Sequence, residues 1–153
     1  MTYYKRRLPD FTESEIETTP IASVRYLIPY IASKKVFDFG CGDGSFAKEM
    51  KKYQADVICV EKNIVLAKEA RRKGLTVHIK DFMDIDLTDG MTIYCATNNE
   101  AIEALWRRIK NLNVHLTLIS YQYPVPGVKP NDIITVPLHH VWLDEFVFLI
   151  YKT

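Results

Sequence analysis

The fold of this 153-residue chain is decided by one stretch, Val36-Phe37-Asp38-Phe39-Gly40-Cys41-Gly42-Asp43-Gly44-Ser45-Phe46. An apolar strand runs into a turn with three glycines, and a helix is expected to follow the turn. Glycine lacks a Cβ atom, so it can adopt a positive φ and let a ligand lie against bare backbone. A helix after such a turn directs its free N–H groups and the positive end of its dipole at the turn. The stretch therefore predicts a cradle for a bound cofactor.

A second apolar strand supports this interpretation. It reads Val57-Ile58-Cys59-Val60 and ends at Glu61, about 17 residues after the glycine turn, which is near the spacing at which a carboxylate can bind ribose hydroxyls. A nicotinamide-binding domain is the main competitor, but it needs the pattern G-x-G-x-x-G, and here the third glycine follows the second after a single residue. The sequence therefore predicts a nucleoside pocket.

Composition narrows the class of protein. The chain has 20 basic and 19 acidic residues, for a net charge of +1, so no strong overall field attracts nucleic acid. A local basic patch remains possible on these numbers. No apolar segment is long enough to span a bilayer, and the N-terminus reads as polar rather than as a signal peptide. We expect a cytoplasmic protein with no membrane partner, made of an N-terminal arm over residues 1–17 and a single domain over residues 18–153.

The cysteines and histidines give no sign of a disulfide or a metal. Free thiols are expected for Cys41, Cys59 and Cys95, because each lies in or beside an apolar strand and none forms a C-x-x-C pair. No metal is predicted, because the histidines lack partners at metal-ligand spacing; they are His78, His115, His139 and His140.

Strands and helices alternate along most of the chain. A helix is expected from Thr18-Thr19-Pro20, with Pro29 weakening its last turn. Beyond the first strand, further strands are expected over 56–61, 77–80, 91–96 and 114–120, helices over 46–53, 64–73 and 100–110, and a final pair of strands over 133–136 and 145–151. The pattern predicts an α/β fold, doubly wound and Rossmann-like, with a mostly parallel sheet and a C-terminal antiparallel hairpin.

From Thr18 onward the chain resembles the class I S-adenosylmethionine-dependent methyltransferases. The likeness rests on the Asp-Phe-Gly-Cys-Gly-Asp-Gly turn, the acidic end of the second strand, an Asp-Phe pair after the third strand, and the terminal hairpin. It implies S-adenosyl-L-methionine as the cofactor and methyl transfer as the reaction. It also implies the cofactor contacts: the glycines and Asp38 at the methionine part, Glu61 at the ribose, and Asp81 and Phe82 at the adenine. Asp43 is a further cofactor candidate, or else a cap of the following helix; the glycines are Gly40, Gly42 and Gly44.

The class of methyl acceptor is inferred from the residues at the ends of the fourth and fifth strands. The Asp/Asn-Pro-Pro-Tyr tetrapeptide of many amino-group methyltransferases is missing there, and Cys95 is interpreted as a core thiol rather than a nucleophile. The segments Thr97-Asn98-Asn99-Glu100 and Ser120-Tyr121-Gln122-Tyr123 resemble the small archaeal protein-lysine methyltransferases.

This second resemblance implies a protein substrate with an accessible lysine. Asn98 would orient the amine, and Tyr121 and Tyr123 would line its tunnel. Asn98 could instead cap a helix, and the tyrosines could be ordinary packing residues. RNA or a small molecule as the acceptor, and a module that binds the cofactor without catalysis, remain open alternatives.

Overall fold

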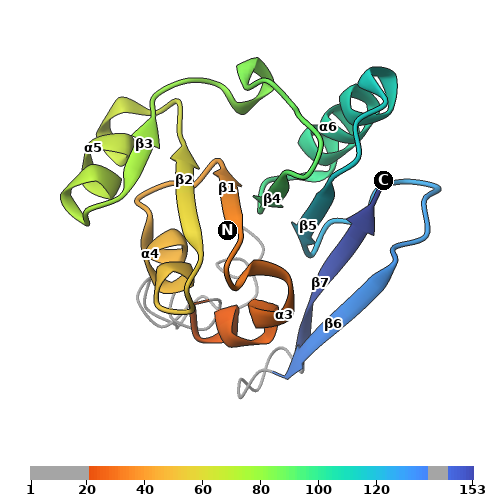
Figure 1. The fold of residues 1–153 in the computed structure, drawn as a ribbon, viewed down its shortest axis with the longest axis horizontal. Helices are drawn as coiled ribbons and strands as arrows, with labels where there is room; N and C mark the ends of the chain where they lie inside the picture. The colour runs from red at the N-terminus through yellow and green to blue at the C-terminus, as the bar shows by residue number, and fades with distance from the viewer. Residues whose placement is uncertain (1–20, 138–144) are drawn as a thin grey trace, which may run out of the picture.

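A computed structural model describes residues 21–137 and 145–153, and these residues build one seven-stranded sheet with the order β3-β2-β1-β4-β5-β7-β6 (Figure 1). The five strands from β3 to β5 run parallel, whereas β7 is antiparallel to both β5 and β6. The predicted fold class is confirmed. The strands are β1 (Lys35–Phe39), β2 (Asp56–Val60), β3 (Thr76–His78), β4 (Thr92–Cys95), β5 (Thr117–Tyr121), β6 (Asp132–Pro137) and β7 (Glu145–Lys152).

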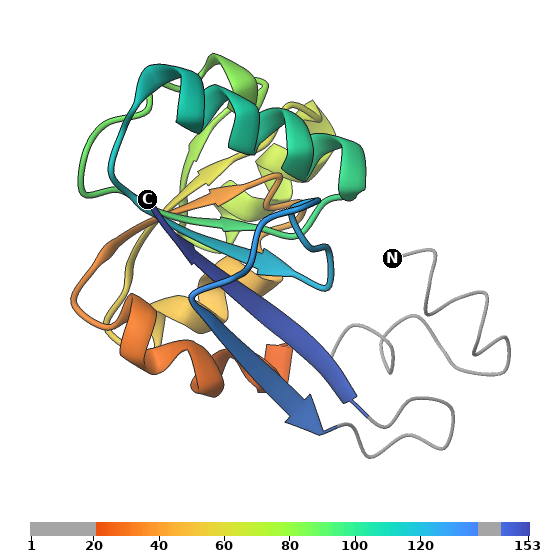
Figure 2. The ribbon, with the colours of Figure 1, turned by 90° about the vertical axis from the view of Figure 1, so that its right-hand side faces the viewer.

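Helices cover both faces of the sheet (Figure 2). One face packs against the 3-10 helix η1 and the helices α3, α4 and α5, and the other against α6 and the short 3-10 helix η2. Each face has its own buried apolar cluster, so the parallel strands are apolar on both sides, as expected for a sheet between helices. The helices are η1 (Ser23–Leu27), α3 (Ile28–Ile31), α4 (Ser45–Lys51), α5 (Ile64–Arg72), η2 (Phe82–Asp84) and α6 (Asn99–Leu112).

The first helical segment differs from the prediction. It is divided into η1 and α3, and Pro29 lies in the first turn of α3 instead of weakening a last turn. Proline is tolerated there because the first turn of a helix has no acceptor for its missing N–H group. Val24 and Leu27 are fully buried. The predicted arm over residues 1–17, the cap Thr18-Thr19-Pro20, and His139 and His140 lie outside the described residues.

Helix α6 shows how the apolar pattern positions the site. Ile102, Leu105 and Ile109 are fully buried on one side of the helix. Ala101 is half-buried and lines the pocket described below. The helix therefore turns an apolar stripe toward the sheet and a line of small residues toward the pocket.

Within the described residues, no helix is long and apolar enough to cross a membrane, and no group of three or more His, Cys, Asp or Glu side chains could hold a metal ion. Cys41, Cys59 and Cys95 are free thiols. Burial raises the pKa of the Cys95 thiol to about 12, so the thiolate that a nucleophile requires is not formed near neutral pH. This agrees with the prediction of a core thiol.

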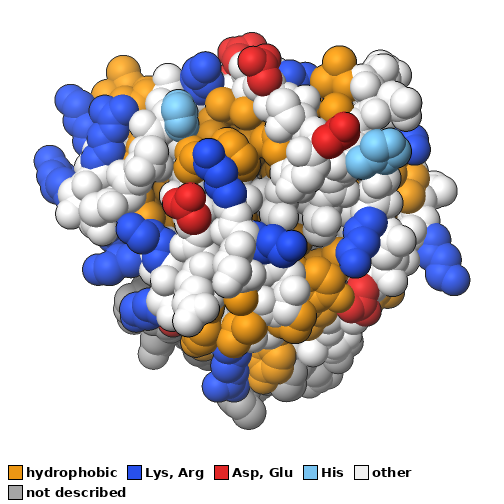
Figure 3. Space-filling view, in the orientation of Figure 1, with side chains coloured by type: hydrophobic (Ala, Val, Ile, Leu, Met, Phe, Trp, Pro, Cys, Tyr) orange, Lys and Arg blue, Asp and Glu red, His pale blue; other side chains and the backbone are white. Residues whose placement is uncertain are grey.

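The surface charge is uneven although the net charge is close to zero. Lys and Arg side chains gather at the left of the molecule, over α4 and α5 (Figure 3). The loop after β3 is acidic instead, with Asp81, Asp84, Asp86 and Asp89. The protein therefore presents surfaces of opposite charge.

Candidate functional site

A pocket of about 380 Å³ lies at the carboxyl ends of the first four parallel strands. The segments that follow parallel strands meet at one edge of a sheet, where open α/β folds bind their ligands. Five of the predicted site residues line this pocket together: Gly40 after β1, Glu61 after β2, Asp81 and Phe82 after β3, and Asn98 after β4.

The carboxylate of Glu61 is held in place by two backbone N–H groups, one from the glycine turn and one from the residue two positions after Glu61. Its Oε1 atom accepts a hydrogen bond from the N–H of Gly42 at 2.9 Å, and its Oε2 atom accepts one from the N–H of Asn63 at 2.8 Å. The side chain is only 8% exposed. A carboxylate has about four acceptor positions, so two remain for the hydroxyl groups of a ligand in the pocket. The glycine turn and the predicted ribose-binding acid are thus one hydrogen-bonded unit.

Gly42 and Gly44 are glycine for different structural reasons. Gly42 has a φ of +61°, and a Cβ atom there would have no protein atom within 4 Å. Gly44 has a φ of +82°, and its Cβ atom would lie 2.9 Å from the Cβ atom of Ala70 in α5. Gly44 therefore lacks a side chain because α5 packs against it, whereas Gly42 borders open space that a ligand could fill.

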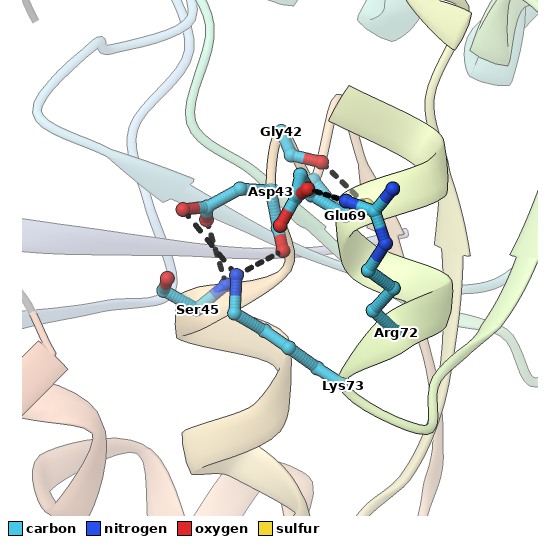
Figure 4. Close-up of polar contacts among 7 residues, drawn as sticks. Gly42, Asp43, Ser45, Glu69, Arg72 and Lys73 are labelled. Carbon is cyan, nitrogen blue, oxygen red and sulfur yellow. Dashed lines mark hydrogen bonds and ion pairs between the residues drawn. The ribbon is translucent and has the colours of Figure 1, made fainter. Parts of the chain in front are cut away.

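Asp43 forms polar contacts that stabilise the glycine turn itself (Figure 4). Its Oδ1 atom accepts a hydrogen bond from the N–H of Ser45 at 2.9 Å, and Lys73 lies 3.4 Å from its Oδ2 atom. Burial alone would raise the pKa of Asp43, but the hydrogen bonds from Ser45 and the charge of Lys73 lower it. The hydrogen bond to Ser45 joins Asp43 to the first residue of α4, although the N-cap position itself is Gly44. Asp43 does not line the pocket, and its contact with a cofactor remains a prediction.

Asp38 is the one buried carboxylate of the turn region with an unsatisfied oxygen. It is 2% exposed, and its Oδ2 atom has no hydrogen-bond partner among the described residues. Burial, followed by the charge of Glu61, raises the pKa of Asp38 to about 8. An unpartnered buried acceptor is costly, so a cationic donor brought to this carboxylate would satisfy it. This fits the predicted place of Asp38 near the amino group of a bound ligand.

Asp81 and Phe82 are ordered by the start of η2. The Oδ1 atom of Asp81 accepts a hydrogen bond from the N–H of Met83 at 2.9 Å. The ring of Phe82 stacks on Phe39 of β1, with centroids 5.1 Å apart and planes 12° apart. An aromatic ring fixed in this way at the pocket wall presents a flat apolar surface, which suits contact with a base.

The three predicted acceptor-side residues are not brought together. Asn98 lines the pocket, and its Oδ1 atom caps α6 by accepting a hydrogen bond from the N–H of Ala101 at 2.8 Å. Tyr121 is 2% exposed and packs against Phe148 on the face covered by α4. Tyr123 packs on the opposite face of the sheet. Neither tyrosine lines the pocket, and their role in a tunnel wall stays a prediction.

Sequence reasoning missed several residues of the pocket wall. Lys62 directly follows Glu61, and Lys80 directly precedes Asp81. Their position beside these two predicted acids was the signal in the sequence that could have identified them. Thr97 also lines the pocket, and its Cγ2 atom would lie 3.4 Å from a Cβ atom placed on Gly40. No pattern in the sequence marks this approach of β4 to the glycine turn.

Several solved structures share this fold, although no protein-family profile and no curated protein matches the sequence. An RNA methyltransferase from Salinibacter ruber, solved with S-adenosyl-L-homocysteine, is 15% identical over 86% of this chain and 88% of its own, with a TM-score of 0.69. Magnesium protoporphyrin IX methyltransferase from Synechocystis PCC 6803, solved with S-adenosylmethionine, is 15% identical over 98% and 89%, with a TM-score of 0.66. A sugar N-methyltransferase from a Streptoalloteichus species is 21% identical over 91% and 60%, with a TM-score of 0.50. At these identities, the likeness establishes a shared fold.

Proposed function

We propose that this chain is an S-adenosylmethionine-dependent methyltransferase. The observation that carries the proposal is the pocket at the carboxyl ends of the parallel strands, where Gly40, Glu61, Asp81 and Phe82 meet. Proteins with the same fold have been solved with S-adenosylmethionine or its demethylated product. Independent support comes from the orphaned oxygen of buried Asp38 and from the open space at Gly42.

Each of these residues has a definite task in the proposal. Glu61 accepts two hydroxyl hydrogen bonds from the ribose, because the N–H groups of Gly42 and Asn63 already orient its carboxylate. Phe82 covers the adenine. Asp38 accepts a hydrogen bond from the ammonium group of the methionine part, which stabilises the ionised carboxylate against the cost of burial.

We further propose a lysine amine of a protein as the acceptor. When bound, the cofactor supplies a sulfonium methyl group, and the protein must position the amine and help it lose a proton, because a lysine with a pKa near 10.4 is not a nucleophile. The second lone pair of the Asn98 Oδ1 atom, beyond the one that accepts from Ala101, is available to orient an N–H bond. Removal of water around the amine would lower its pKa and favour the neutral form.

Transfer from labelled S-adenosylmethionine into separate pools of lysate proteins, total RNA and small molecules tests this proposal. We expect label in protein, stable to acid and recovered as methylated lysine after hydrolysis. Label in RNA or small molecules alone would reject the lysine acceptor and keep the methyltransferase. Tight cofactor binding by calorimetry without turnover on any pool would favour a non-catalytic binding module, and absence of cofactor binding would reject the whole proposal.

A further inference from the structure

The outer sides of α4 and α5 carry a concentration of positive charge that the pocket does not explain. We call this surface the basic face. Its only carboxylates within the two helices are Glu49 and Glu69, both half-buried. Its six cationic side chains, five in the two helices and Lys52 directly after α4, are all exposed: Lys48, Lys51, Lys52, Lys68, Arg71 and Arg72.

The two helices form one continuous surface. Gly44 at the start of α4 packs against Ala70 of α5. At the last residue of α4, the Nζ atom of Lys51 lies 3.5 Å from the carbonyl oxygen of Gly74, which follows α5. Figure 3 shows the result as a group of Lys and Arg side chains at the left of the molecule. Because the end of α5 lies against α4, cations of both helices can act on one ligand together.

Much of this charge is not neutralised within the protein. Glu49 pairs with Lys52 at 2.9 Å, and Glu69 pairs with Arg72. In the part of the chain that the structure describes, no carboxylate lies within ion-pair distance of the remaining four cations. Arg71 donates one hydrogen bond to the carbonyl oxygen of Val77 at 3.0 Å, which positions its guanidinium group while leaving other donors free. The four cations are Lys48, Lys51, Lys68 and Arg71.

We propose that the basic face binds the phosphate backbone of RNA. Positive side chains spread over two helix sides match a chain of negative charges, and counterion release supplies the binding free energy. Arg71 and Arg72 add guanidinium groups that can bind phosphate through two parallel hydrogen bonds. A flexible single strand can follow such an uneven set of cations. Contacts of this kind read no bases, so we expect weak binding that tolerates many sequences.

The arrangement favours a nucleic acid over a lipid surface. A helix that lies on a membrane carries apolar and cationic side chains at the same level along its length. In α5 the exposed apolar side chains and the arginines lie at opposite ends of the helix. The exposed apolar residues Ile64, Val65 and Leu66 form its first turn, and Arg71 and Arg72 lie in its last turn.

The basic face lies apart from the expected acceptor end of the pocket. It belongs to α4 and α5, whereas Asn98 follows β4 and begins α6. RNA bound through its phosphates at the basic face would therefore contact residues other than Asn98, which is proposed to orient the acceptor. The inference does not rest on the proposed methyl transfer, and it can be tested without cofactor.

Fluorescence anisotropy with a labelled single-stranded RNA, measured over a series of salt concentrations, tests the proposal. The test variant is the triple substitution Lys48→Gln, Lys51→Gln and Lys68→Gln. Each phosphate neutralised contributes about 0.7 to the slope of log K against log salt for single strands. We expect the triple variant to bind at least about tenfold more weakly at 0.1 M salt, with a slope smaller by about 2.

A matched control removes the same charge from the other side of the molecule. Arg107→Gln, Lys110→Gln and Lys129→Gln alter three exposed cations of α6 and the loop before β6. We expect this control to bind RNA as the wild type does. Equal weakening in both triple variants, no RNA binding by the wild type, or tighter binding to duplex DNA or to phosphatidylserine vesicles than to RNA would overturn the proposal. Circular dichroism confirms that both variants are folded.

Discussion

Lys73 donates a hydrogen bond from its Nζ atom to the main-chain oxygen of Asp43 at 2.8 Å, although the two residues are 30 positions apart. The same ammonium group lies 3.4 Å from the Oδ2 atom of Asp43. Asp43 stands between Gly42 and Gly44, so this contact ties the end of α5 to the centre of the glycine turn (Figure 4). The shape of the proposed cofactor cradle therefore depends on a residue outside the turn.

Replacement of Lys73 by Gln should loosen this connection. We expect the variant to lose about 1 kcal/mol of unfolding free energy, as for one hydrogen bond, because the partly exposed ion pair adds little. Cofactor affinity should fall several-fold, since the turn must be ordered again on binding. Urea unfolding and calorimetry measure the two effects. The neighbouring Arg72→Gln, which breaks only an exposed pair with Glu69 in the same helix, serves as the control and should change neither quantity appreciably.

Two alanine substitutions in the glycine turn should separate folding from binding. Gly44→Ala brings its Cβ atom to 2.9 Å from Ala70, at a φ of +82°, so we expect a loss of about 3 kcal/mol in unfolding free energy from strain and overpacking. Gly42→Ala meets no protein atom and should lose only about 1 kcal/mol. Its Cβ atom would occupy the space proposed for the ligand, so its cofactor affinity should fall by at least about tenfold. Similar stability losses in the two variants, by urea unfolding, would contradict this division of roles.

Glu61→Ala tests the proposed ribose contact. The substitution removes the hydrogen bonds to the ligand and the two that anchor Gly42 and Asn63, and we expect cofactor binding to weaken by about 1–3 kcal/mol. Glu103→Ala, at an exposed glutamate of α6, should bind as the wild type does. Unchanged affinity of Glu61→Ala in calorimetry would reject Glu61 as the ribose contact.

Asp38 should make both stability and binding depend on pH. Its pKa is about 8 in the folded protein against an ordinary value of 3.8, so between these values the folded state holds a proton that the unfolded state has lost. The contribution of Asp38 to stability is therefore complete below pH 4 and is lost as the pH rises toward 8, by up to about 1.4 kcal/mol per pH unit.

The comparison of wild type with Asp38→Asn isolates this contribution. Urea unfolding at pH 5, 6, 7 and 8 should show a steeper loss of stability in the wild type than in the variant. Affinity for a ligand ammonium should rise with pH toward about 8 in the wild type, because the ionised carboxylate is the better acceptor. Parallel stability curves for the two proteins would contradict the raised pKa.

Most elements could be predicted because their causes are local. The helix predicted over 64–73 is observed as Ile64–Arg72 and stops before Gly74, which has a φ of +84°. The strands predicted over 133–136 and 145–151 are observed as Asp132–Pro137 and Glu145–Lys152. The predicted and observed ends of these elements coincide or differ by one residue, since the last residues of an element depend on neighbours that local sequence does not specify.

The site was only partly predictable, because proximity in a sheet depends on strand order. The sequence predicted residues at several strand ends, and five of them line one pocket. It could not predict that Tyr121 and Tyr123, two positions apart, pack on opposite faces of the sheet. Nor could it predict that Asp43 would contact Lys73.

By itself, the sequence determined the α/β class, the glycine turn with its two acidic strand ends, and the antiparallel finish, because hydrophobic period, glycine and strand-end chemistry act over a few residues. Only the tertiary structure decided that β7 inserts between β5 and β6, that Glu61 is held by the N–H of Gly42, and that α4 and α5 join their charges on one face. These features arise between residues far apart in the chain, whose contacts form only when the sheet is assembled and its faces are covered.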